Sequence, residues 1–145
     1  MRLTENLRRQ HRELAETGRE ILRLLQPARI AVEPAPVRQL LSRLAGTLRV
    51  HVAMEDESLY PRLLAHADPR VRRKAREFLD EMGCIREVFV GYLRQWPSEG
   101  PIAARPDEFV ADTRRVVGLL YERMQRENTE LHRLADEAIG EPALT

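Results

Sequence analysis

Residues 68–96 read DPRVRRKAREFLDEMGCIREVFVGYLRQW. Asp68 followed by Pro69 predicts the start of a helix, since proline is favoured at the first helical position. Apolar residues then recur at alternating steps of three and four, which is the period of a helix with one buried face. This stretch therefore predicts a long amphipathic helix that packs its apolar face against other helices. The positions of that face are Val71, Ala75, Phe78, Met82, Ile85, Phe89, Tyr92 and Trp96.

Three further pieces of the chain have the same helical period. Proline and glycine separate them at residues 27–36, 61–69 and 96–106. In each piece, one stripe of positions is expected to be buried. The stripes are Leu7, His11, Leu14, Gly18, Ile21 and Leu25; Val37, Leu41, Leu44, Leu48, His51, Glu55 and Leu59; and Phe109, Thr113, Val116, Leu120, Arg123, Glu127, Leu131 and Leu134.

The ends of the helices carry their own signals. Thr4 is predicted to cap the first helix and Asp107 the fourth, while Gly140 and Pro142 are predicted to end the fourth. Strand signals are absent from the sequence: there is no sustained alternation and no Asn-Gly or Asp-Gly hairpin turn. Helices of roughly 20 residues joined by short loops predict an all-α, antiparallel up-down-up-down four-helix bundle. We expect residues 1–145 to form this bundle as a single domain.

Composition excludes several classes of protein. The chain has 24 basic and 23 acidic residues, and its net charge of +1 argues against nucleic acid as a partner. No stretch approaches the roughly 18 apolar residues of a membrane span, and the first residues lack the apolar run of a signal peptide. The single cysteine, Cys84, cannot form an internal disulfide. A cytoplasmic protein without a membrane partner is expected.

Polar side chains interrupt the apolar stripes. Charged residues are rarely buried unless they are paired or bound to a metal, so these positions need a common explanation. In an antiparallel bundle they lie at a similar depth, to within about one turn. Imidazoles and carboxylates that meet in a core suit Fe, Mn or Zn. The interrupting residues are His11, His51, Glu55, Arg123 and Glu127.

Three local strings carry a family resemblance: LRRQHREL at 7–14, HVAMEDESLYP at 51–61 and ENTEL at 127–131. Over nearly its whole length the sequence resembles the hemerythrin-like, or HHE cation-binding, domains. Members of that family usually bind two iron ions between four helices. By position, His11 and His51 match the histidine pair of one ion. The resemblance also implies that Glu55 and Glu127 are the bridging carboxylates.

The other half of the site departs from the family pattern. Met82 stands where the third helix of the family has a histidine, and Arg123 stands where the fourth helix has one. The remaining histidines, His66 and His132, are not expected to fill these places. His66 lies near the end of the second helix, and His132 lies five residues after Glu127. Both imidazoles of the second ion are therefore missing, and Met82 is interpreted as core packing.

We expect Arg123 to replace the second metal, because a guanidinium is permanently charged and can pair with two carboxylates. One ion is then held by His11, His51, Glu55 and Glu127. Two alternatives stay open: no metal, with Arg123 paired to the carboxylates, or two ions with unusual ligands. The metal is expected to be iron, although Mn and Zn suit the same ligands.

Two classes of function follow from this site. The first is iron binding, with sensing or binding of iron or of a small ligand such as O2 or NO. The alternative is a metal-free four-helix scaffold that acts as a regulatory or protein-interaction module, whose partner is another protein or a second copy in a homodimer. No enzyme is expected, because no nucleophile–base pair, phosphate loop or dinucleotide fingerprint is present in the sequence.

Overall fold

The computed structural model describes residues 2–140. Within that range the regular elements are all helical and no strand occurs. Two of the elements are π-helical turns, η1 and η2, which continue directly from the preceding α-helix. In chain order the elements are α1 (Arg2–Arg23), α2 (Pro27–Val32), α3 (Ala35–Met54), η1 (Glu55–Leu59), α4 (Tyr60–Leu64), α5 (Pro69–Gln95), α6 (Glu99–Ala104), α7 (Pro106–Arg126), η2 (Glu127–Leu131) and α8 (His132–Ala138).

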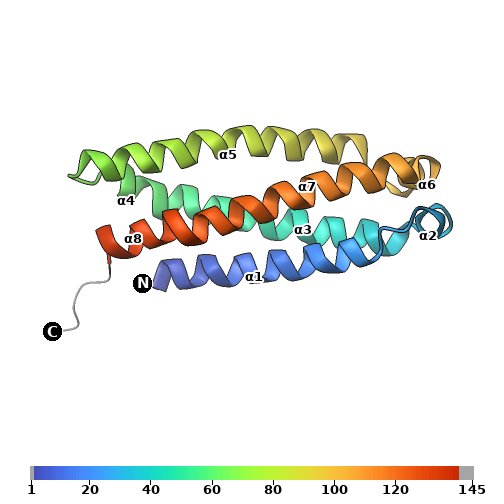
Figure 1. The fold of residues 1–145 in the computed structure, drawn as a ribbon, viewed down its shortest axis with the longest axis horizontal. Helices are drawn as coiled ribbons and strands as arrows, with labels where there is room; N and C mark the ends of the chain where they lie inside the picture. The colour runs from blue at the N-terminus through green and yellow to red at the C-terminus, as the bar shows by residue number, and fades with distance from the viewer. Residues whose placement is uncertain (1, 141–145) are drawn as a thin grey trace.

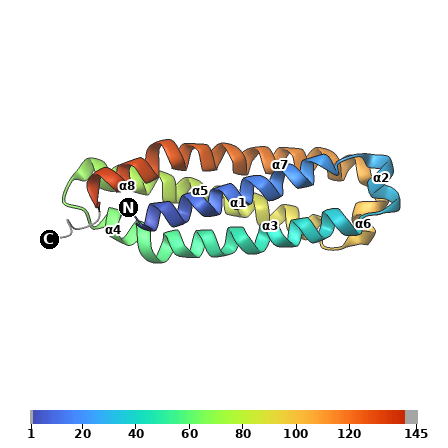
Figure 2. The same ribbon diagram turned by 90° about the horizontal axis from the view of Figure 1, so that it is seen from below.

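The longest elements, α1, α3, α5 and α7, lie side by side along one axis (Figures 1 and 2). Helix α1 packs against α3, and α5 packs against α7. The short helices α2 and α6 lie together at one end of the molecule, while α4 and α8 extend α3 and α7 at the other end (Figure 1). Each π-turn therefore lies within a long helical segment, and the first and last residues of each turn are buried.

Burial follows the predicted stripes closely. Every predicted position is buried except Leu134, which is half-buried. The apolar core has two parts: a larger cluster that includes Leu41 and Phe109, and a smaller one that includes Leu59 and Phe78. Buried polar side chains separate the two parts, since His11 lies between Leu7 of one cluster and Leu14 of the other. The buried polar side chains at this level are Gln10, His11, His51, Glu55, Arg123, Glu127 and His132.

The helix ends agree only in part with the sequence. Asp68 caps α5 as predicted, because its side chain accepts a hydrogen bond from the backbone N–H of Arg70 at 2.9 Å. The prediction for Thr4 is wrong: α1 begins at Arg2, and the Thr4 hydroxyl is buried and donates to Asp136. The Thr4 side chain therefore bonds to a residue near the C-terminal end of the chain and does not cap its own helix.

The prediction for Asp107 is also wrong. Helix α7 begins at Pro106, so Asp107 lies in its first turn, where a carboxylate still interacts favourably with the helix dipole. At the other end, α8 stops at Ala138, and Gly140 adopts a φ of 60° that favours glycine. Pro142, predicted to end the same helix, lies outside the described residues.

Short helices occupy the segments at residues 27–36 and 96–106, which were expected to be loops. Helix α2 begins at Pro27 and buries Ile30, and α6 buries Ile102. Both isoleucines join the larger apolar cluster beside Trp96, so these helices close one end of the core. Their few residues give too short a pattern for a helix to be recognised from periodicity.

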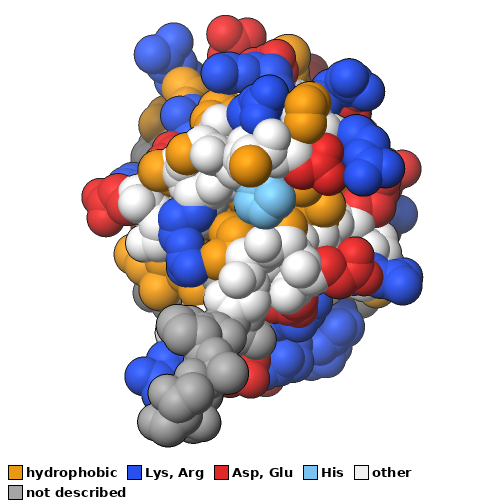
Figure 3. Space-filling model, turned by 90° about the vertical axis from the view of Figure 1, so that its left-hand side faces the viewer, with side chains coloured by type: hydrophobic (Ala, Val, Ile, Leu, Met, Phe, Trp, Pro, Cys, Tyr) orange, Lys and Arg blue, Asp and Glu red, His pale blue; other side chains and the backbone are white. Residues whose placement is uncertain are grey.

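The helices of residues 2–140 are all too short or too polar to cross a membrane. The face that carries α4 and α8 shows acidic, basic and hydrophobic side chains interspersed (Figure 3). Neither sign of charge dominates this face, in keeping with the balanced composition.

Candidate metal centre

The predicted ligands meet in the polar layer between the two apolar clusters. His11 comes from α1, His51 from the last turn of α3, and Glu55 and Glu127 from the first positions of η1 and η2. None of these side chains is more than 3% exposed. The structure thus brings together all four residues that the sequence analysis selected, from three segments far apart in the chain.

Two imidazoles and a carboxylate converge on one point. His11 Nε2 lies 2.8 Å from Glu127 Oε1 and 3.0 Å from His51 Nε2. His51 Nε2 lies 3.3 Å from the same Glu127 oxygen and 3.2 Å from Glu55 Oε1. Ligands on one ion, at bonds of about 2.1 Å, lie about 3 Å apart when adjacent. The separations in this cluster fit that requirement.

The outer nitrogens of both rings are held by side-chain amides. His11 Nδ1 lies 2.8 Å from Asn128 Oδ1, and His51 Nδ1 lies 2.7 Å from Gln10 Oε1. The Gln10 amide group donates to the Met54 sulfur, which orients its oxygen toward the ring. Since an amide oxygen only accepts, each Nδ1 carries a hydrogen and each Nε2 is directed inward as a donor atom for a metal.

Sequence reasoning did not select Gln10 or Asn128. Both are direct chain neighbours of predicted ligands, Gln10 before His11 and Asn128 after Glu127. Polar residues beside a buried histidine or carboxylate were the available signal. From the helical period alone, Gln10 and Asn128 lie next to the buried stripe. The period cannot show that their side chains contact the imidazole rings of His51 and His11.

The electrostatics of the cluster favour a positive charge at its centre. Burial alone would lower the pKa of His51, but hydrogen bonds and charge from Glu127 and Glu55 raise that pKa to about 9. Burial would raise the pKa of Glu127, yet hydrogen bonds from His11 and His51 and the charge of Arg123 hold it well below its usual range. A proton on His51 and a metal ion are therefore alternative ways to place positive charge between these carboxylates.

Arg123 is buried beside the cluster, and each of its nitrogens has a partner. Its Nε donates to Glu127 Oε2 at 2.9 Å. One terminal nitrogen donates to the Phe78 carbonyl at 2.9 Å and to the Tyr60 hydroxyl at 3.1 Å, and the other lies 3.4 Å from Glu81. The guanidinium also lies over the Phe78 ring. The predicted counter-charge is thus in place, although its second carboxylate is Glu81 rather than Glu55.

Met82 packs as an apolar side chain. It is 5% exposed and belongs to the larger apolar cluster. Met82 lies on the buried face of α5, as predicted from the helical period, and lines the same cavity as Arg123. Core packing is the role that its surroundings support.

His132 lies in the polar layer, although no role there was predicted for it from the sequence. It was expected not to fill the vacant positions at Met82 and Arg123. Its side chain is fully buried, its ring stacks on His11 with centroids 5.0 Å apart, and its Nε2 lies 3.6 Å from Glu55 Oε2. Neither ring nitrogen has a hydrogen-bond partner within residues 2–140, and the same is true of Glu55 Oε2. His66, in contrast, lies away from the site and bonds to the Ala138 carbonyl.

The π-turn explains why the position of His132 was not foreseen. At about 3.6 residues per turn, a residue five positions after Glu127 would point about 140° away from it. In η2 the backbone N–H of His132 bonds to the carbonyl of Glu127, five residues earlier. The wider turn returns His132 to the face of the helix that carries Glu127.

The residues fit a bound metal ion. Two groups each have their donor atoms within 4.8 Å of one another: His11, His51 and Glu127, and Glu55, Glu127 and His132. Buried polar atoms without a partner are rare in folded proteins, because each costs free energy. Two of the unpaired atoms, Glu55 Oε2 and His132 Nε2, lie 3.6 Å apart in this cluster, and nitrogen and carboxylate donors together suit iron, manganese or zinc.

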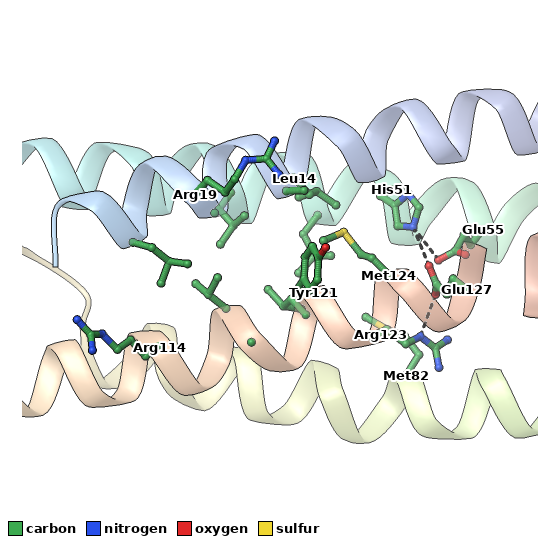
Figure 4. Close-up of a pocket in the computed structure, with 18 residues that line it drawn as sticks. Leu14, Arg19, His51, Glu55, Met82, Arg114, Tyr121, Arg123, Met124 and Glu127 are labelled. Atoms are coloured by element: carbon green, nitrogen blue, oxygen red, sulfur yellow. Dashed lines mark hydrogen bonds and ion pairs between the residues drawn. The ribbon is translucent and has the colours of Figure 1, made fainter. Parts of the chain in front are cut away.

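A cavity of about 330 Å³ leads from the surface to the cluster. It runs between α1 and α7, and its lining is mainly apolar. Figure 4 shows Arg114 at one end and His51, Glu55 and Glu127 at the other. Leu22 and Tyr121, which are 41% and 49% exposed, mark where it reaches the surface. Small uncharged molecules therefore have a path to the cluster.

Comparison with known families agrees with this arrangement. The family model described as the hemerythrin HHE cation binding domain matches residues 2–135. No curated protein and no solved structure matches the chain significantly. The matched range contains the ligand cluster, Arg123 and both π-turns.

Proposed function

Because the chain belongs to the hemerythrin HHE cation-binding family, we propose that it binds one iron ion through His11, His51, Glu55 and Glu127. One observation carries this proposal: two imidazole Nε2 atoms and a carboxylate oxygen lie within 3.3 Å of one another. These inward-facing atoms need a positive charge between them, which either a metal ion or a proton on His51 supplies. Manganese and zinc suit the same donors and are the competitors of iron.

Arg123 supports one ion rather than two. It stands at a position where the family has a histidine ligand, and it neutralises Glu127 from the side opposite to His11 and His51. Met82 offers no nitrogen or oxygen at the other missing position. The second half of the site is thus filled by a guanidinium and a thioether side chain.

We further propose that the loaded site binds or senses a small uncharged ligand such as O2 or NO, or reports on iron itself. A ferrous ion with an open position supplies a binding site for such a ligand. The apolar cavity between α1 and α7 favours uncharged molecules over ions. Binding is proposed rather than catalysis, because the described residues that line the cavity include no Ser, Thr or Cys that acts as a nucleophile.

The fold is proposed to be the antiparallel up-down-up-down four-helix bundle of this family. In this arrangement α3–η1–α4 and α7–η2–α8 each count as one long segment beside α1 and α5. Helices α2 and α6 then belong to the connections at one end. Three of the four long segments contribute buried polar side chains to the polar layer, and α5 faces the layer with Phe78 and Met82.

A titration of the Fe(II)-loaded protein with NO tests the proposed function. Under anaerobic conditions, we expect a saturable change in the visible spectrum of the wild type. His51→Ala removes a ligand and should abolish the change. His66→Ala removes an imidazole outside the cluster and should leave it intact. A wild type that takes up iron but gives no spectral change would overturn the role in ligand binding.

A metal-free scaffold is the second candidate, and one observation favours it. The raised pKa of His51 and the buried Arg123 provide positive charges that balance Glu55 and Glu127 without a metal. This function requires that the melting temperature of the protein does not change when Fe(II), Mn(II) or Zn(II) is added. The unpaired atoms of Glu55 and His132 favour the metal-bound form over this alternative.

A further inference from the structure

Two parts of the chain share a local pattern around the site. His51, Glu55 and Tyr60 have the same spacing as Arg123, Glu127 and His132. Each glutamate begins a π-turn, and the backbone N–H of the residue five positions later bonds to its carbonyl. Tyr60 and His132 are therefore structurally equivalent, each at the end of its π-turn.

The two equivalent residues face opposite halves of the site. The Tyr60 hydroxyl accepts a hydrogen bond from Arg123 at 3.1 Å, so it belongs to the half that the guanidinium fills. The His132 ring stacks on His11 and its Nε2 faces Glu55. His132 therefore belongs to the half that contains both predicted imidazole ligands.

The contact between His132 and Glu55 is not a hydrogen bond. At 3.6 Å, Nε2 and Oε2 are too far apart for one, and the structure assigns neither atom another partner within residues 2–140. Ligands of one ion lie between about 3 Å and about 4.2 Å apart, depending on whether they are adjacent or opposite. The separation of these two atoms falls in that range. Glu127 lies close to both residues, since the donor atoms of Glu55, Glu127 and His132 are all within 4.8 Å of one another.

We propose that His132 is a further ligand of the same ion, which rests on the proposed function. The complete ligand set is then three imidazoles and two carboxylates, rather than two of each. His132 lies outside every ligand position that the family resemblance carries over to this chain. The site is asymmetric: one half binds the ion with His132, and the equivalent half holds Arg123 with Tyr60.

This ligand set has two consequences. Five protein ligands leave at most one open position on a six-coordinate ion, and that position must face the cavity for a small ligand to bind. His132 also compensates for the imidazoles missing at Met82 and Arg123, since it restores a third nitrogen donor. Loss of His132 therefore weakens metal binding without disturbing the guanidinium half of the site.

X-ray absorption of the wild type loaded anaerobically with Fe(II) tests the proposal without a variant. We expect imidazole scattering from about three histidines per iron. The same measurement on His132→Phe is expected to show about two, with Fe(II) affinity reduced about a hundredfold or more, because loss of an outer partner alone costs about 10–100-fold. His66→Phe makes the same chemical change away from the site and should match the wild type. Circular dichroism of the metal-free variants checks that each is folded.

The outcomes separate this proposal from the proposed function. If the wild type and His132→Phe have the same Fe(II) affinity and the same number of imidazoles per iron, His132 is not a ligand. In that case, loss of iron in His51→Ala would still support the four-residue site. If the wild type binds no metal, the proposed function fails as well. Two ions in the wild type that fall to one in His132→Phe would overturn the shared ion and assign His132 to a separate one.

Discussion

Arg123 Nε donates to Glu127 Oε2 at 2.9 Å, one helical turn away, and both side chains are buried. The other oxygen of Glu127 faces His11 and His51. One carboxylate is thus shared between a permanent cation and an imidazole pair. This sharing divides the polar layer into a half that is already neutralised and a half that is available to a metal.

Arg123→Met should strongly destabilise the metal-free protein. The substitution keeps an unbranched, flexible side chain but leaves Glu127 without its guanidinium, and breaking a buried ion pair from one side costs about 3–5 kcal/mol. Arg126→Met is the matched control, because Arg126 pairs with Glu81 but is 42% exposed, where an ion pair contributes about 1 kcal/mol or less. Urea denaturation measures both, and equal effects would contradict the role of Arg123.

Restoring the missing imidazoles should restore the second ion. Met82→His combined with Arg123→His places nitrogen donors at both positions that depart from the family. We expect the iron content after anaerobic loading to rise to about two ions per chain, since imidazole and carboxylate donors suit iron. Met82→His alone keeps the guanidinium and is expected to remain at about one. A double variant that binds no more iron than the wild type would show that Arg123 does not occupy the second position.

The stability of the metal-free protein should fall as pH rises above neutrality. The pKa of His51 is raised from 6.5 to about 9, so the folded state binds this proton more tightly than the unfolded state does. The stabilisation is complete below pH 6.5 and is lost as pH rises through about 9. A melting temperature several degrees lower at about pH 10 than at about pH 6 is expected. His51→Phe should not show this difference, and a flat wild-type profile would refute the raised pKa.

Filling the cavity should slow ligand entry without changing the ligands of the ion. Gly118 lines the cavity, and a Cβ built there meets no atom within 4 Å, so Gly118→Leu can project into the opening. We expect NO association with the Fe(II) protein to slow about tenfold, with little change in iron affinity. Gly91 on α5 is equally unobstructed and lies outside this cavity, so Gly91→Leu serves as the control in stopped-flow measurements. An unchanged rate in Gly118→Leu would place the entry path elsewhere.

Much of this fold was predictable because its signals are local and periodic. The buried stripe of α5 follows a plain helical period, and Asp68 with Pro69 marks its start. His11 and Glu127 were selected because a polar residue at a buried position needs a partner. The family model confirms the resemblance that those residues suggested.

The parts that the sequence did not predict depend on non-local packing. His132 was not selected as a ligand, because in a regular helix it would point away from Glu127, whereas η2 widens the turn. Helices α2 and α6 are too short for a period, and burial of Ile30 and Ile102 against Trp96 stabilises them. A single sequence gives no direct signal for such tertiary contacts.

Metal stoichiometry tests the central claim most directly. Elemental analysis after anaerobic Fe(II) loading and gel filtration should give about one iron per chain in the wild type and essentially none in His51→Ala. About two ions per chain would contradict the replacement of the second metal by Arg123. No retained metal under loading conditions would contradict the metal site itself and leave the charge-balanced scaffold as the function of the bundle.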